Sequence, residues 1–195
     1  MMNGDIQVLP QAFNTPLIPL LLLLLAGALL LWINRQRLYK WWLGFTTRRC
    51  LNHLGLEQLT AVQCPDGLDG QFKIDRLLLR HDGISVLIEK RYAGRIFAGD
   101  GIDRWTQMLG QRSYSFRNPL HELELQVKAV AACFPGIEVD GYLFFDHSAT
   151  FPRDRPQRVI HPQHIPDALK RNHRHRIDPS VVQAWKRFIN ERAAA

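Results

Sequence analysis

The sequence predicts an α/β protein with a mixed sheet flanked by helices and preceded by one N-terminal transmembrane helix. Three observations support this fold class. A long uncharged apolar run lies near the N-terminus, short apolar runs separated by turn residues fill the middle of the chain, and Asn118-Pro119 and Asp178-Pro179 are typical of helix starts. The chain has 195 residues, 46% apolar and 22% charged, which is the composition of one globular domain with an appendage.

The apolar run is expected to anchor the chain in a membrane. Leu17 to Ile33 carries no charge, and with Pro16 it gives about 27 Å of helix, which just spans a bilayer. Arg35 and Arg37 follow the run, so the positive-inside rule places the rest of the chain in the cytoplasm, at the cell membrane (the inner membrane of a bacterium). A cleaved signal peptide is the alternative. It fits less well because no basic region precedes the run and no small-residue cleavage site follows it.

Charge and composition divide the chain into five segments. They are a short extracytoplasmic N-terminus at 1–15, a transmembrane helix at 16–34, a basic juxtamembrane segment at 35–50, a folded domain at 51–169 and a basic helical tail at 170–195. The net charge of +7 is concentrated outside the folded domain, so it is weak evidence for nucleic-acid binding. Three cysteines without a C-x-x-C spacing indicate neither a zinc knuckle nor a disulfide framework, and they fit a reducing compartment.

The expected elements of the domain follow from periodicity and turn signals. In order, they are a juxtamembrane helix at 40–59, a strand at 61–64, a hairpin within 71–94, a strand at 95–97, a loop or edge strand around Trp105, a helix at 118–133, strands at 139–145 and 159–160, and helices at 165–172 and 179–192.

The hairpin holds the most informative pair of residues, Asp75 and Glu89. Its loop is expected at His81-Asp82-Gly83, because a glycine in a short polar segment is typical of such loops. If Arg80 pairs with Ile84, then Asp75 lies directly opposite Glu89 and both carboxylates share one face, where like charges destabilise the sheet unless they are compensated. A metal ion would compensate them.

Two cations border these carboxylates in the same register, because Lys73 then faces Arg91. Paired carboxylates can hold Mg²⁺, which activates a bound water for phosphodiester hydrolysis, while a cation orients the water or offsets charge. The alternative is structural: Asp75 and Glu89 form two ion pairs with Lys73 and Arg91 on a solvated sheet face.

Five segments in order resemble one known family. They are Phe72-Lys73-Ile74-Asp75-Arg76-Leu77, Gly83-Ile84 to Ile88-Glu89, Tyr92-Ala93-Gly94-Arg95-Ile96, Trp105-Thr106-Gln107 and Phe116-Arg117-Asn118-Pro119-Leu120. Together they resemble the nuclease-related domain, NERD, over roughly Leu51 to Leu169. The resemblance implies a restriction-endonuclease-like fold of the PD-(D/E)XK type, in which an Ile-Asp carboxylate and an E-x-K motif build a Mg²⁺-dependent nuclease site. Asp75 matches the first of these, and Glu89 matches the glutamate of the second.

The chain also departs from the family pattern. Arg91 stands where the family has the lysine of E-x-K, the segment from Glu89 to Gly94 is one residue shorter, and Glu122 stands where the family has glutamine. Arginine stays protonated in proteins, so Arg91 could stabilise charge but could not act as a base. Lys73 could supply the missing ammonium group.

Two functions are therefore expected at the membrane. The first is Mg²⁺-dependent hydrolysis of DNA or RNA, with Asp75 and Glu89 as metal ligands and Arg91 and Lys73 as electrostatic helpers. The alternative is a catalytically inactive nuclease-fold module that binds nucleic acid or protein.

Several histidines give weaker signals. His161 and His164 lack a cysteine partner, and His173 and His175 lie in a basic run that would repel a metal cation. That run is expected to be a solvated face, with phosphate binding as its functional alternative.

Overall fold

The computed structural model describes residues 17–65, 70–171 and 176–193. The chain divides into two units, Met1–Trp42 and Leu43–Ala195. His173 and His175 of the basic run lie outside the described residues.

Helix α1 (Leu17–Leu51) is one uninterrupted helix of 35 residues. Its segment Pro19–Leu51 is long and apolar enough to cross a membrane. Leucines of the apolar run are exposed, Leu23 by 70%. The prediction of a separate juxtamembrane helix at 40–59 is wrong in two respects. Residues 40–51 continue α1, and residues 57–59 belong to a strand.

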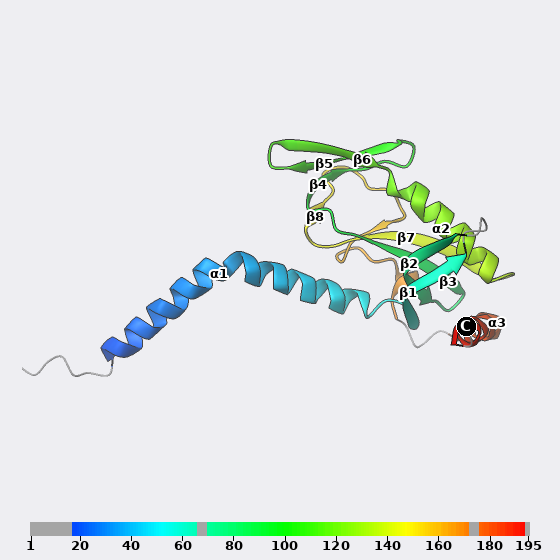
Figure 1. Ribbon diagram of the computed structural model, residues 1–195, viewed down its shortest axis with the longest axis horizontal. Helices are drawn as coiled ribbons and strands as arrows, with labels where there is room; N and C mark the ends of the chain where they lie inside the picture. The colour runs from blue at the N-terminus through cyan, green and yellow to red at the C-terminus, as the bar shows by residue number, and fades with distance from the viewer. Residues whose placement is uncertain (1–16, 66–69, 172–175, 194–195) are drawn as a thin grey trace, which may run out of the picture. The chain divides into compact units, whose positions relative to one another are not determined.

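The second unit contains two sheets (Figure 1). The first has the order β1-β2-β3-β7-β9 and consists of β1 (Glu57–Pro65), β2 (Gln71–Leu79), β3 (Gly83–Lys90), β7 (Glu138–Phe145) and β9 (Val159–Ile160). The pairs β1–β2 and β2–β3 are antiparallel, whereas β3–β7 and β7–β9 are parallel, so this sheet is mixed as expected.

The second sheet has the order β6-β5-β4-β8 and is smaller. It consists of β4 (Gly94–Phe97), β5 (Arg104–Leu109), β6 (Arg112–Arg117) and β8 (Ala149–Thr150). The β5–β6 hairpin stands apart from the first sheet in Figure 1. Trp105 thus lies in a regular strand, and its side chain is fully buried in the core.

Helices cover both faces of the first sheet. Helix α2 (Pro119–Cys133) begins as expected, with Asn118 accepting a hydrogen bond from the N–H of Leu120 at 2.9 Å. Helix α3 (Pro179–Ala193) packs into the same core through Trp185, whose indole N–H donates to Glu57 at 2.8 Å. The opposite face is covered by the end of α1 and by the 3-10 helix η1 (Asp167–Leu169). Of the helix expected at 165–172, only η1 forms within the described residues 165–171.

Candidate functional site

The register of the β2–β3 hairpin differs by one residue from the expected one. Leu79 pairs with Ile84 and Arg76 with Leu87, so the predicted pairing of Arg80 with Ile84 is wrong. The hairpin closes with the N–H of Arg80 donating to the carbonyl of Gly83. Gly83 is part of β3 rather than the loop. A Cβ at this position would lie 2.4 Å from the carbonyl oxygen of Glu138 in β7, so the close approach of the two strands requires glycine.

The regular pairing of β1 with β2 is interrupted at Asp75. Val62 pairs with Ile74 and Thr60 with Arg76, but Ala61 and Asp75 between them form no such pair. Ala61 has φ +54°, a left-handed conformation that costs a non-glycine residue about 1 kcal/mol. The alternation of faces breaks here, and Asp75 is therefore not held to the face that a regular strand would give it.

Asp75 and Glu89 still lie together, by a different geometry from the one expected. The backbone N–H of Glu89 donates to the Asp75 carboxylate at 2.8 Å. Lys73 and Arg91 line the same hollow, of about 590 Å³, although the ladder between β2 and β3 ends before it reaches them. The structure thus brings all four predicted residues into one hollow.

Glu89 forms an ion pair with Arg76, which is not among the predicted site residues. Arg76 donates from Nε to the Glu89 carboxylate at 2.6 Å and from a terminal nitrogen to the side chain of Gln58 at 2.8 Å. Arg91, which is 82% exposed, lies 3.8 Å from the other Glu89 oxygen. In the observed register Arg76 pairs with Leu87, so Glu89, two residues further along β3, lies on the same face as Arg76. The predicted register, shifted by one residue, places the two side chains on opposite faces.

Lys90 connects the hollow to helix α2. Its ammonium group donates to Glu122 at 2.7 Å, and Gln126 donates to the same carboxylate at 3.4 Å. Lys90 also lines the hollow at the end of β3. Its partner Glu122 stands where the family has glutamine, so this departure from the family pattern forms an ion pair at the edge of the hollow.

Both carboxylates of the hollow are already engaged, which does not favour a resident Mg²⁺ ion. Glu89 accepts a short bond from Arg76, and Asp75 accepts from the backbone N–H of Glu89. Four cationic side chains line the same hollow: Lys73, Arg76, Lys90 and Arg91. Within the described ranges no group of three or more His, Cys, Asp or Glu side chains could hold a metal ion. The hollow carries an excess of positive charge, which attracts anions and repels a divalent cation.

The histidines after β7 form a structural cluster outside this hollow. His147 and His161 contact each other edge to face, with ring centroids 5.5 Å apart. Burial, followed by the neighbouring His147 and Arg155, lowers the pKa of His161. Asp146 accepts from the backbone N–H of Ser148 at 2.8 Å, which fits the expected strand end.

We expect His161 to make folding stability pH-dependent. Its pKa is lower in the folded chain than in the unfolded chain, so the unfolded chain binds more protons as pH falls below about 6.5, and stability is lost toward the folded pKa. Thermal unfolding of the full chain in detergent, followed between pH 7.5 and 5.5, should therefore depend less on pH in His161→Gln than in the wild type. Substitution of the exposed His53 by Gln is the matched control. Equal pH dependence in all three proteins would contradict this role.

Comparison with known proteins agrees with this architecture. The model of the nuclease-related domain, NERD, matches residues 45–146, just over half of the chain. A protein of Bacillus anthracis described as uncharacterized is 33% identical over 58 residues, which cover 30% of this chain and 27% of that protein. The chain therefore spans about a quarter of that relative's length. No solved structure matches. On the family match, this chain belongs to the nuclease-related domain family.

Proposed function

We propose that the domain binds the phosphodiester backbone of DNA or RNA in the Asp75–Glu89 hollow without cutting it. The observation that carries this proposal is the charge of the hollow: four cations and two carboxylates line it, and the charge stays positive when the Glu122 partner of Lys90 is included. Arginine and lysine are the side chains that bind nucleic-acid phosphates, and they do so without reading sequence.

The individual cations have different roles in this proposal. Lys73 and Arg91 are exposed, so they can contact a phosphate without any rearrangement of the domain. Arg76 is held by Glu89 and Gln58, which fix its guanidinium group in the hollow. Glu89 competes with phosphate for Arg76, so it limits affinity rather than providing a ligand.

We further propose that α1 tethers this domain to a membrane. Its apolar part is long enough to cross a bilayer, and the basic residues after it favour a cytoplasmic location for the domain. A reporter enzyme that works only in the cytoplasm should then be active when it is fused after Ala195. Activity of a reporter that works only outside the cytoplasm would contradict this orientation.

Binding by the full chain in detergent tests the proposal. Fluorescence anisotropy with single-stranded and duplex DNA should show binding in EDTA that is at least as tight as in Mg²⁺, and dissociation constants that rise steeply with salt. Binding that requires Mg²⁺ would contradict a metal-independent phosphate site. Substitution of Lys73 and Arg91 by Gln should weaken binding about tenfold or more. Two phosphate contacts are lost, so binding releases fewer counterions from the nucleic acid.

A further inference from the structure

The candidate hollow continues into a longer groove. A second hollow, between the end of β6 and the start of α2, shares Lys90 and Tyr92 with it. A third hollow, along the first turns of α2, shares Arg117, His121 and Leu125 with the second. The three hollows therefore adjoin one another from β3 to the β5–β6 hairpin, and we call this row of hollows the groove.

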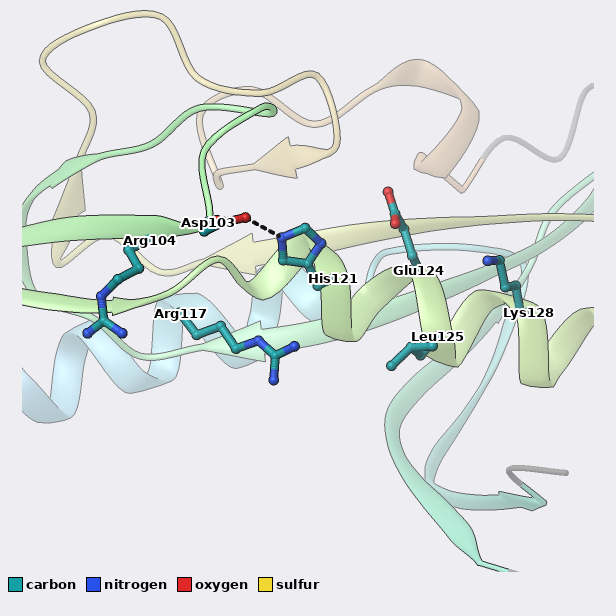
Figure 2. A pocket seen from close by; sticks show the side chains of 7 residues that line it. All are labelled: Asp103, Arg104, Arg117, His121, Glu124, Leu125 and Lys128. Carbon is teal, nitrogen blue, oxygen red and sulfur yellow. Dashed lines mark ion pairs between the residues drawn. The ribbon is translucent and has the colours of Figure 1, made fainter. Parts of the chain in front are cut away.

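The far end of this groove contains two arginines whose placement needs an explanation. Arg104 and Arg117 are directly opposite each other in the β5–β6 ladder and share one face. Like charges in that arrangement destabilise a hairpin unless an anion lies between them. Both side chains line the third hollow, and Figure 2 shows them on the same side of the hairpin.

The two arginines are not neutralised by carboxylates. Arg104 donates to the side chain and the carbonyl of Ser115, at 2.9 and 3.1 Å, which are both neutral groups. Arg117 is exposed and makes no hydrogen bond or ion pair within the described part of the chain.

The carboxylates that line the same hollow lie near side chains other than the two arginines. Asp103 lies 3.9 Å from His121, as the dashed line in Figure 2 shows, and Glu124 lies 3.9 Å from Arg158. Lys128 adds a further exposed cation at the end of the hollow.

We propose that Arg104 and Arg117 form a second phosphate-binding position, which holds the backbone of a single nucleic-acid strand that extends from the Asp75–Glu89 hollow along the groove. This inference rests on the proposed function and adds the path of the ligand. The phosphate offsets the repulsion between the two guanidinium groups. The adjoining hollows give the strand a path between the two positions.

The test uses the full chain in detergent and two oligothymidylates, of about 5 and about 25 nucleotides, because strand-binding sites cover several nucleotides. The double variant Arg104→Gln/Arg117→Gln is compared with Arg95→Gln/Arg112→Gln. The control removes the same charge from exposed arginines of the same small sheet that line none of the three hollows. Thermal unfolding checks that both variants are folded.

We expect the groove variant to bind the long oligomer about tenfold more weakly than the control variant, with a salt slope that is smaller by about 1.4, since two phosphate contacts to a single strand are lost. Binding of the short oligomer should be the same in both variants. Equal binding of the long oligomer by both variants would overturn the second position while leaving the first intact. Absence of wild-type binding to either oligomer would instead overturn the proposed function. Loss of binding to anionic phosphatidylglycerol vesicles alone, in the groove variant, would assign the arginine pair to lipid and overturn the proposal as well.

Discussion

Replacing Glu89 by Gln should strengthen nucleic-acid binding by about tenfold, an effect of about 1.4 kcal/mol. Glu89 accepts a 2.6 Å bond from Arg76 and lies near Arg91, so it occupies a guanidinium that a phosphate could use and repels the phosphate itself. Anisotropy titrations at two salt concentrations measure the change.

The sign of this effect separates the two accounts of the hollow. Arg76→Gln should shift affinity in the opposite direction, about tenfold weaker, because it removes the cation and leaves Glu89 in place. Glu191→Gln, an exposed carboxylate on α3, controls for net charge and should change affinity only slightly. If Glu89→Gln weakened binding, Glu89 would be acting as a ligand or as the holder of one, and the phosphate-binding account would be wrong.

Replacing Arg80 by Met should destabilise the domain by about 3 kcal/mol. Arg80 is 4% exposed at the end of β2, where its guanidinium group donates to Asp140 and lies 3.3 Å from Asp82 and 3.6 Å from Glu138. Asp140 also accepts from Ser85 and Tyr142, and burial followed by the Asp140 charge raises the pKa of Tyr142. Met fills similar volume but leaves the Asp140 carboxylate without its cation.

Urea unfolding of the full chain in detergent, monitored by tryptophan fluorescence, measures this loss. Asp82→Asn is the matched control, since Asp82 is 68% exposed and its contact with Arg80 should contribute less than about 1 kcal/mol. Similar losses from both substitutions would show that Arg80 does not hold β3 and β7 together through Asp140.

The sequence predicts elements well where one physical signal dominates. The Asn118 cap and the Asp178-Pro179 start place α2 and α3, and the apolar run 139–145 gives β7 almost to the residue. It fails where tertiary contacts decide. Trp105 lies near turn signals, yet it is part of β5, because its ring is buried and its indole N–H donates to Gly99. That contact depends on chain segments which local periodicity does not report.

The candidate site shows the same division. Residue types and the family resemblance identify Asp75 and Glu89, and the structure places them together. The register was missed because a glycine in a polar segment reads as a turn residue, whereas Gly83 is required by the close approach of β7. The interruption at Ala61 and Asp75 was missed because an alanine with positive φ has no signature in sequence. Arg76 therefore lies outside the predicted set of residues, although it forms an ion pair with Glu89.

Cleavage by the full chain is the measurement that tests the central claim most directly. Wild type and Glu89→Ala are incubated with linear duplex and single-stranded DNA in Mg²⁺, in Mn²⁺ and in EDTA, and the products are separated on denaturing gels. We predict intact DNA under every condition for both proteins, together with metal-independent binding by the wild type. Cleavage that requires a divalent cation and disappears in Glu89→Ala would show that the hollow is a nuclease site and would contradict the account.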